Sequence, residues 1–477
     1  MNARELALDV FCEMEKTGVY GNVLIGNVLD KYDYEDPREK AFFKRLTEGT
    51  LERRITLDWV LDCFSKTPVQ KMKPLIRSLL RLSAYQILYM ESVPDSAACN
   101  EAVKLAKKRG FSSLAGFVNG VLRSISRSRD RLPWPDPKKD AVKSMSVRSS
   151  LPEWIVELWL AQYGQEQTEA MLEGLEKQRP LIIRFAESLS EEEVLKAVSA
   201  ILRTGVEVSA HPLCAKAFAL DGCEGVTSLP GFAEGLFYAQ DVSSMLAVET
   251  AGIRPGMNVL DLCSAPGGKA ILAWEKLGAG GNIAGAVKAG DVSEAKIARI
   301  RENAARMGAA AVKACSQPTT AAALQERPGS CRNVSMEISV WDARRHMEEL
   351  DGWADVMLAD LPCSGLGVMG RKKDIRYRVK REDLDSLISL QKEILEASWR
   401  YVKPGGILLY STCTVDRMEN EEMVRFLTEN FPFETESLDP WLPEQLRNAD
   451  TAGGCCQLFG GLQDTDGFFI ARLRRKQ

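Results

Sequence analysis

Histidine is scarce in this sequence, and no paired-cysteine motif is present. Only His211 and His346 occur among 477 residues, and the 12 cysteines are scattered without any C-x-x-C spacing. A structural zinc site is therefore not expected, no metal is predicted, and the thiols should be reduced. With so few imidazoles, proton transfers in any active site would fall to carboxylates or thiols.

Long apolar runs are also missing. No stretch of 18 or more apolar residues occurs, so no membrane-spanning helix is expected. Residues 1–15 form a charged helical stretch rather than a signal peptide, which predicts a cytoplasmic protein. A length of 477 residues exceeds that of one compact domain, so two or three domains are expected.

An overall excess of basic charge is absent as well, because the formal net charge is −4. Any nucleic-acid surface must therefore be local. Three basic clusters are candidates: Lys107 to Arg109, Arg123 to Arg131, and the string of Arg371, Lys372, Lys373, Arg376, Arg378, Lys380 and Arg381. One such cluster is more often a solvated face than a binding patch, but three in an acidic chain favour nucleic-acid binding modestly.

Four segments differ in their periodicity. Apolar residues recur at helical spacing through residues 1–130, which predicts an all-helical domain. Residues 131–150 begin with a proline-rich stretch that cannot continue a helix, so a linker is predicted there. Residues 151–237 mix short strands with helices, as in a small α+β connecting subdomain. Strands and helices alternate through residues 238–477, which predicts an α/β Rossmann-like core with a parallel sheet.

The core opens with an apolar strand, a turn rich in small residues and a helix, within residues 259–269. Gly267 and Gly268 lack a Cβ, so a ligand could approach the backbone closely, and free N–H groups begin the helix at Lys269. A tight turn without a ligand is the commoner reading of an isolated Gly-Gly pair. The loop matches neither G-x-G-x-x-G nor G-x-x-x-x-G-K-[ST], so a dinucleotide or a nucleoside triphosphate is not favoured.

Acidic residues follow the later strands. Asp291 ends the second strand about 20 residues beyond the glycines, where a carboxylate can accept hydrogen bonds from ribose hydroxyls. Asp342 and Asp360 end the next two strands. Each acid alone is more often a helix cap, but together they favour a site at the carboxyl edge of the sheet.

Two cysteines also follow predicted strands. Cys363 lies in the string Asp-Leu-Pro-Cys-Ser-Gly that begins at Asp360, and Cys413 lies in Ser-Thr-Cys-Thr. A free buried cysteine is usually a small apolar residue, but polar neighbours surround both of these. Both thiols should emerge on the same rim as the glycine loop.

These strings resemble motifs of the RNA cytosine carbon-5 methyltransferases. Residues 259–269 are similar to motif I of that family, and the two cysteine strings are similar to its motifs IV and VI. The resemblance implies S-adenosylmethionine as cofactor and a site that includes Cys263, Ser264, Ala265, Pro266, Gly267, Gly268, Lys269, Asp291, Asp342 and Asp360. Within this set, the resemblance gives Asp342 a contact with the adenine.

The resemblance also implies catalytic roles. Cys413 would add to carbon 6 of the cytosine, because carbon 5 attacks a methyl group only after such an addition. Asp360 would bind the N3 edge of the base, and Cys363 would assist loss of the carbon-5 proton and release of the enzyme. The thiolate needs nearby positive charge, and the target base must be unstacked or lie in a loop.

The helical segment resembles the NusB-like domain, most clearly at residues 84–88 and 117–123. That family binds RNA, so Arg123 becomes a candidate phosphate contact, although a solvated helix end is an equal alternative. The string of Arg371, Lys372, Lys373, Arg376 and Arg378 is a candidate for holding phosphates that flank the target base.

Three features depart from the family pattern. The chain has Arg184-Phe185-Ala186 where Arg-Val-Asn is common, and Lys373 where proline is frequent. Residues 309–334 are a low-complexity insertion expected to lie at the surface.

The domain combination resembles that of the bacterial 16S ribosomal RNA cytosine-C5 methyltransferases over nearly the whole chain. The resemblance implies a monomer that acts on small-subunit ribosomal RNA. Two alternatives stay open: a transfer RNA cytosine-C5 methyltransferase, and a non-catalytic RNA-binding protein of ribosome assembly.

Overall fold

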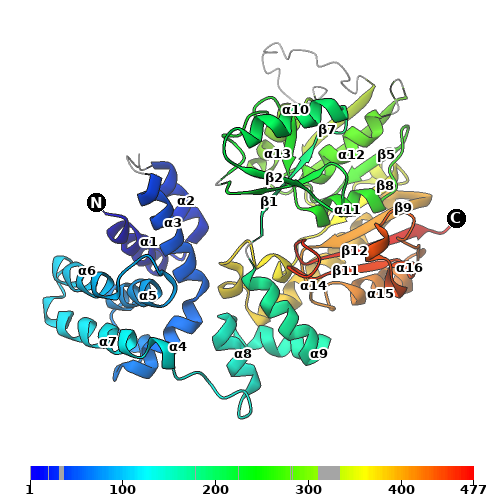
Figure 1. Cartoon of the computed structure of the whole chain (residues 1–477). Helices are drawn as coiled ribbons and strands as arrows, with labels where there is room; N and C mark the ends of the chain where they lie inside the picture. The colour runs from blue at the N-terminus through cyan, green and yellow to red at the C-terminus, as the bar shows by residue number, and fades with distance from the viewer. Residues whose placement is uncertain are drawn as a thin grey trace. The chain divides into compact units, whose positions relative to one another are not determined.

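The protein divides into two compact units. The computed structural model describes residues 2–19, 21–31, 37–177, 179–223, 225–279, 281, 283–309 and 333–477. The first unit contains residues 1–176 and 369–380, and the second contains residues 177–368 and 381–477 (Figure 1). Most of the insertion expected at 309–334 lies outside the described residues. No helix in the described part of the chain is long and apolar enough to cross a membrane.

The first unit is helical throughout its described residues, as the periodicity predicts. Its α-helices are α1 (Ala3–Thr17), α2 (Gly21–Lys31), α3 (Pro37–Glu52), α4 (Arg54–Phe64), α5 (Pro74–Tyr89), α6 (Asp95–Lys108), α7 (Ala115–Arg127), α8 (Ala141–Ser149) and α9 (Glu153–Glu176). Helix α5 is central: Ile76, Leu79 and Leu80 are buried against apolar side chains of the surrounding helices. The predicted helical bundle is confirmed.

The proline-rich segment belongs to this unit instead of ending it. The indole Nε1 of Trp59 donates to the carbonyl of Pro133 at 2.8 Å, and the hydroxyl of Ser144 donates to the carbonyl of Pro135 at 3.2 Å. Thr56 on α4 donates to the carbonyl of Val147 on α8 at 2.6 Å. These contacts hold residues 131–150 against α4, so the unit continues to Glu176.

The second unit begins with a small antiparallel sheet in the order β2-β3-β1-β4. Its strands are β1 (Leu181–Phe185), β2 (Glu207–Ala210), β3 (Ala217–Asp221) and β4 (Phe237–Ala239), with helix α10 (Glu191–Leu202). Arg184 on β1 is buried, pairs with Glu275 and donates to Gln240 at 3.0 Å. Because Glu275 lies on a helix of the larger sheet, this ion pair fixes the small sheet to the core.

The larger sheet runs in the order β10-β12-β9-β8-β5-β6-β7, and β11 pairs with β12. Its strands are β5 (Asn258–Asp261), β6 (Gly285–Asp291), β7 (Val334–Val340), β8 (Ala354–Asp360), β9 (Val402–Thr412), β10 (Phe433–Thr435), β11 (Cys455–Leu458) and β12 (Phe468–Arg475). Strands β5 to β9 are parallel, whereas β12 is antiparallel to β9. The predicted parallel core is confirmed.

Helices cover both faces of this sheet (Figure 1). They are α11 (Val242–Thr250), α12 (Gly268–Gly278), α13 (Glu294–Arg306), α14 (Arg381–Ser398), α15 (Glu421–Asn430) and the short α16 (Ala449–Ala452). Val259 packs with Ile271 of α12, while the next residue, Leu260, packs with Ile394 of α14 in a separate core. This alternation along β5 places the two apolar cores on opposite faces of the sheet.

Candidate active site

The predicted site residues meet at the carboxyl edge of the parallel strands. Strand β5 ends at Asp261, β6 at Asp291, β8 at Asp360 and β9 at Thr412. Asp360 lies directly beside Ser411 in the β8–β9 ladder, and the Ser411 hydroxyl donates to Oδ1 of Asp360 at 2.9 Å. Parallel strands bring their carboxyl ends to one edge, which is why the sequence could predict this meeting.

The glycine loop joins β5 to α12 in the predicted way. Gly267 has φ +106°, a conformation that side-chain-bearing residues rarely adopt, and α12 starts at Gly268. A Cβ on Gly268 would lie 3.1 Å from the ring of Tyr238. The two glycines therefore permit a turn that larger residues would strain or crowd.

Asp291 lies against this loop. One carboxylate oxygen accepts from the N–H of Ala265 at 3.1 Å, and the other accepts from Val292 N–H at 2.7 Å and pairs with Lys296 at 2.8 Å. Asp291 is only 5% exposed. The structure thus brings Asp291 to the glycine loop, where it also supports the loop backbone.

Asp342 lies two positions after the end of β7 and is bound to a neighbour. Its Oδ2 is 2.7 Å from Nη2 of Arg344, and the Arg344 N–H donates to Oδ1 at 3.1 Å. These bonds lower the pKa of Asp342 to about 2. The carboxylate is therefore charged, with Arg344 as its main partner.

Two valines at this edge were not singled out from the sequence. Val292 is 57% exposed and Val340 is 43% exposed, next to Asp291 and two residues before Asp342 respectively. Each valine places an exposed apolar surface within two residues of one of these acids. An apolar residue within two positions of each acid is the sequence signal that could have indicated them.

Lys269 is buried instead of solvated, and it connects the loop to the acids. Its Nζ lies 2.6 Å from Oδ2 of Asp360 and 5.2 Å from the ring centre of Phe468. Burial alone would lower the pKa of Lys269, but the carboxylates of Asp360 and Asp261 and the electrostatic interaction with Cys413 raise the pKa overall. The ammonium therefore stays charged close to the Cys413 thiol.

The two predicted catalytic cysteines are in contact. Their Sγ atoms are 3.4 Å apart. The hydrogen bond with Cys413, burial, and the charges of Glu419 and Asp360 raise the pKa of Cys363 well above its usual range. The Cys363 thiol is therefore neutral, and the Lys269 ammonium interacts electrostatically with Cys413.

The basic string folds with the helical unit. Lys373 Nζ pairs with Glu52 at 2.6 Å, and the hydroxyl of Tyr377 donates to the Glu52 carbonyl at 2.6 Å. Arg376 is 1% exposed and donates to the carbonyl of Met369 at 3.3 Å. Arg376 must therefore be removed from the expected phosphate contacts, because its guanidinium is buried and bonded to the backbone.

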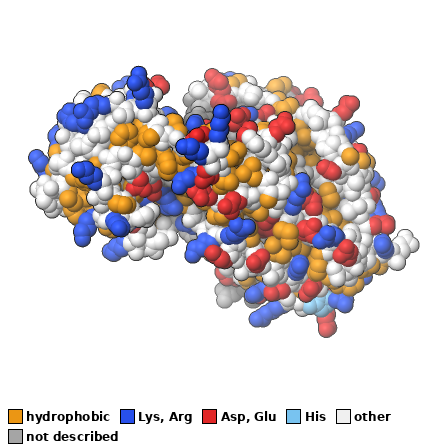
Figure 2. Space-filling model, turned by 90° about the horizontal axis from the view of Figure 1, so that it is seen from below, with side chains coloured by type: hydrophobic (Ala, Val, Ile, Leu, Met, Phe, Trp, Pro, Cys, Tyr) orange, Lys and Arg blue, Asp and Glu red, His pale blue; other side chains and the backbone are white. Residues whose placement is uncertain are grey.

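Other predicted basic residues reach the surface. Lys372 is exposed, Arg371 is half-buried, and Arg378 lies 3.5 Å from Asp374. Arg123 is exposed on α7 and donates to Asn119 at 3.0 Å. On the face shown in Figure 2, basic side chains lie among acidic and apolar ones without one continuous basic surface.

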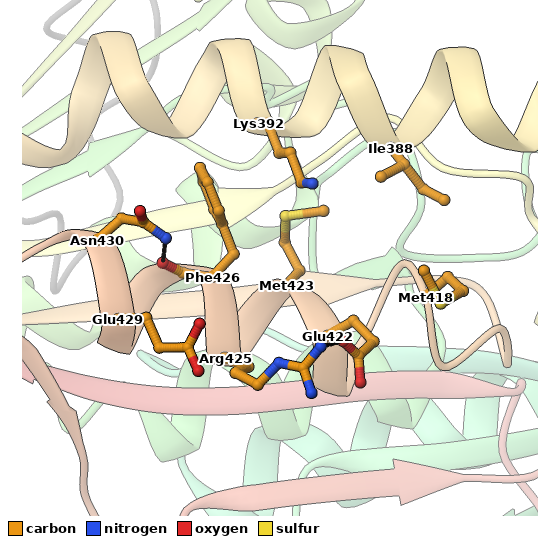
Figure 3. Close-up of a pocket in the computed structure, with 9 residues that line it drawn as sticks. All are labelled: Ile388, Lys392, Met418, Glu422, Met423, Arg425, Phe426, Glu429 and Asn430. Carbon is orange, nitrogen blue, oxygen red and sulfur yellow. Dashed lines mark hydrogen bonds and ion pairs between the residues drawn. The ribbon is translucent and has the colours of Figure 1, made fainter.

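A groove of about 250 Å³ lies between α14 and α15 (Figure 3). It contains none of the predicted site residues and is lined by Ile388, Lys392, Met418, Glu422, Met423, Arg425, Phe426, Glu429 and Asn430. Its charged residues are partly neutralised, because Glu422 pairs with Arg425. The region of the two thiols and the glycine loop is therefore a better candidate for the active site than this groove.

Family models match most of the chain. Residues 250–474 match the 16S rRNA methyltransferase RsmB/F model, and residues 1–127 match the NusB family. Residues 151–227 match the ferredoxin-like domain of the same RsmF/B-like methyltransferases. This last match spans α9 and strands β1 to β3 of the small sheet, so it crosses the division between the compact units after Glu176.

Individual proteins match over the whole length. The chain is 34% identical to "Probable ribosomal RNA small subunit methyltransferase B" of Bacillus subtilis (strain 168), covering 100% of this chain and 99% of the relative. It is 29% identical to the ribosomal RNA small subunit methyltransferase B of Cronobacter sakazakii, with coverages of 100% and 99%. The solved structure of PH0851 has the same fold, with TM-score 0.76, 22% identity and coverages of 100% and 99%. The chain therefore belongs to the 16S rRNA methyltransferase RsmB/F family and is an rRNA methyltransferase with a NusB-family domain at its N-terminal end.

Proposed function

We propose that this protein transfers a methyl group from S-adenosylmethionine to carbon 5 of a cytosine in 16S rRNA, with Cys413 as the nucleophile. The observation that carries the proposal is the pair of thiols 3.4 Å apart, next to the Lys269–Asp360 ion pair and on the rim of the glycine loop. Two cysteines in contact with each other and close to a buried cation are suited to reversible covalent addition.

The strand-end residues fit S-adenosylmethionine. When bound, this cofactor supplies an electrophilic methyl group. The glycine loop from Cys263 to Lys269 would hold it, with Asp291 at the ribose and Asp342 near the adenine. The exposed side chains of Val292 and Val340 offer the apolar cover that a flat purine ring needs.

Cys413 would begin the reaction as a thiolate next to the Lys269 ammonium. The sulfur forms a bond to carbon 6 of the cytosine, and the electron pair of the carbon 5–carbon 6 double bond becomes available at carbon 5. Asp360, 28% exposed at the side chain, would hydrogen-bond the N3 edge of the base by sharing a proton with N3, and this proton offsets the negative charge that develops there. Carbon 5 then takes the methyl group.

Cys363 would act after the methyl transfer. As a neutral thiol, it does not compete with Cys413 for carbon 6, and it lies within contact distance of the reacting sulfur. It would give its own proton to the Cys413 sulfur as the bond between that sulfur and carbon 6 breaks, and it would take up the carbon-5 proton in exchange. The carbon 5–carbon 6 double bond then reforms and the enzyme is released.

The helical unit would hold the RNA. Arg123, Arg371 and Lys372 are the proposed phosphate contacts, because they retain surface exposure while Arg376 does not. Phosphate contacts of this kind make binding salt-dependent. The target base itself must be unstacked before carbon 6 can meet a thiol.

The test is a methylation assay with unmodified 16S rRNA and labelled S-adenosylmethionine, followed by identification of the nucleoside. We expect 5-methylcytidine at a defined position, and none from the Cys413→Ala variant. Unmodified transfer RNA serves as the competing substrate. Cofactor binding without transfer to either RNA would overturn the proposal in favour of a non-catalytic role.

A further inference from the structure

A buried polar cluster lies behind the two thiol loops. Ser364, Gln391, Thr414, Glu419 and Asn420 are each at most 3% exposed. Buried polar side chains are costly unless they are hydrogen-bonded, and a fully bonded cluster fixes one arrangement of the chain. The bonds of this cluster to the neighbours of Cys363 and Cys413 show that it fixes the backbone around the two thiols.

Both neighbours of Cys363 are held. The N–H of Ser364 donates to Oε1 of Glu419 at 2.9 Å, and the Ser364 hydroxyl donates to the other oxygen of the same carboxylate. On the other side of Cys363, Nε2 of Gln391 donates to the carbonyl of Pro362 at 2.9 Å. The same Nε2 donates to Glu419 at 3.0 Å. Glu419 and Gln391 thus fix the backbone on either side of Cys363.

Both neighbours of Cys413 are held as well. The Thr412 hydroxyl donates to Oδ1 of Asn420 at 2.6 Å, and Nδ2 of Asn420 donates to the carbonyl of Thr414 at 3.2 Å. The same Nδ2 donates to Gln457 on β11 at 2.8 Å. A single amide side chain therefore spans the backbone around Cys413.

The two loops are also joined directly. The hydroxyls of Ser364 and Thr414 are 2.7 Å apart, and the N–H of Gly367 donates to the carbonyl of Cys413 at 3.0 Å. Because Glu419 and Asn420 are consecutive, a displacement of one loop is transmitted to the other. The separation of the sulfur atoms is set by this shared support.

We propose that Glu419 and Asn420 are positioning residues that hold the Cys363 and Cys413 thiols in contact for the reaction. This inference rests on the thiol mechanism proposed above. Two residues close to Glu419 and Asn420 in the chain line the groove between α14 and α15, namely Met418 and Glu422 (Figure 3). Glu422 therefore offers a matched control carboxylate close to Glu419 in the chain, with no bond to either thiol loop among those described.

The experiment compares Glu419→Ala, Glu419→Gln, Asn420→Ala and the control Glu422→Ala in the full chain. Steady-state methylation gives kcat and KM for RNA, and calorimetry gives the affinity for S-adenosylmethionine. Diamide oxidation followed by peptide mass spectrometry gives the rate of the Cys363–Cys413 disulfide, which reports thiol contact without requiring activity. Circular dichroism and thermal unfolding check the fold.

For Glu419→Ala we expect kcat to fall about 100-fold, because a misplacement of about 1 Å can cost that much. KM and cofactor affinity should stay within about twofold, and disulfide formation should slow about tenfold in parallel. Glu419→Gln should recover most of the wild-type kcat and most of the wild-type disulfide rate, because its amide oxygen can still accept from Ser364. Glu422→Ala should behave as wild type.

Two results would overturn the inference: wild-type kcat in Glu419→Ala, or a lowered kcat with an unchanged disulfide rate. If Glu419→Ala does not fold, Glu419→Gln and Asn420→Ala decide by the same two readouts. Failure of the thiol mechanism is a separate outcome, recognised by full activity of Cys413→Ala. In that case a slowed disulfide in the Glu419 variants would still show that the support exists, but its catalytic purpose would be refuted.

Discussion

Lys269 and Asp360 form an ion pair between helix α12 and the end of β8, with Nζ 2.6 Å from Oδ2. The pair is the point at which the glycine loop, the proposed base-binding acid and the Cys413 thiol come together. Loss of the cation would leave Asp360 with an unpaired charge in a mostly buried site and would remove positive charge from Cys413.

We therefore expect Lys269→Met to lower the single-turnover rate of methylation at least about 100-fold, since electrostatic groups in closed sites contribute on that scale. Lys276→Met is the control, because Lys276 lies on the same helix but pairs with Glu249. Equal rates for wild type and Lys269→Met would remove Lys269 from the mechanism.

The cysteines should give different defects. Cys413→Ala should show no methyl transfer, because the sulfur proposed to add to carbon 6 is removed. Cys363→Ala should methylate the base and then stall, leaving a protein–RNA adduct that migrates slowly on a denaturing gel. The adduct should vanish in the double variant. An adduct that accumulates in Cys413→Ala instead would exchange the two roles.

Asp291→Ala should weaken S-adenosylmethionine binding by roughly 1.5–3 kcal/mol, the range for a hydrogen bond to a charged group. The structure adds a second cause, because Asp291 also accepts from Ala265 in the glycine loop. Calorimetry measures the affinity of Asp291→Ala, and Lys296→Ala, which removes only the outer partner of Asp291, is the control. Wild-type affinity in Asp291→Ala would exclude it from the cofactor site.

Asp261 should make stability depend on pH. Burial raises its pKa from 3.8 to about 7, so the folded protein binds this proton more tightly than the unfolded chain. The stabilisation is complete below about pH 4 and is lost as the pH rises through about 7. Between pH 5 and pH 8 the free energy of unfolding should fall by about 2–3 kcal/mol more in wild type than in Asp261→Asn.

Urea unfolding at pH 5, 6, 7 and 8 measures this difference. Asp385→Asn is a suitable control, because Asp385 is exposed. Parallel pH profiles for wild type and Asp261→Asn would show that Asp261 titrates normally in the folded protein.

The local sequence pattern predicted the features that depend on the ends of strands and on helical periodicity. The glycine loop, Asp291, Asp360 and the two cysteines could be placed on one rim, since parallel strands all end at the same edge. The family resemblance, confirmed by whole-length relatives, supplied the proposed chemistry that pattern alone could not.

The remaining features depend on pairings between distant parts of the chain. Arg376 looked like a surface cation because its sequence neighbours are basic, and only folding against the helical unit reveals its burial. Glu419 and Asn420 resemble an ordinary helix start in sequence, and their bonds to Ser364 and Thr412 require the assembled sheet. The contact between α4 and α8, which joins residues 131–150 to the helical unit, likewise pairs residues far apart in the sequence.

The segment of residues 369–380 limits how far this protein can be treated as modular. It follows Cys363 closely in the sequence, yet it is part of the helical unit and is fastened there through Lys373 and Tyr377. A chimera that exchanged only residues 1–176 would bring a foreign surface to this native segment. A donor helical domain should therefore be transferred together with its own counterpart of residues 369–380. The two stretches form one structural unit although they are separated in the sequence.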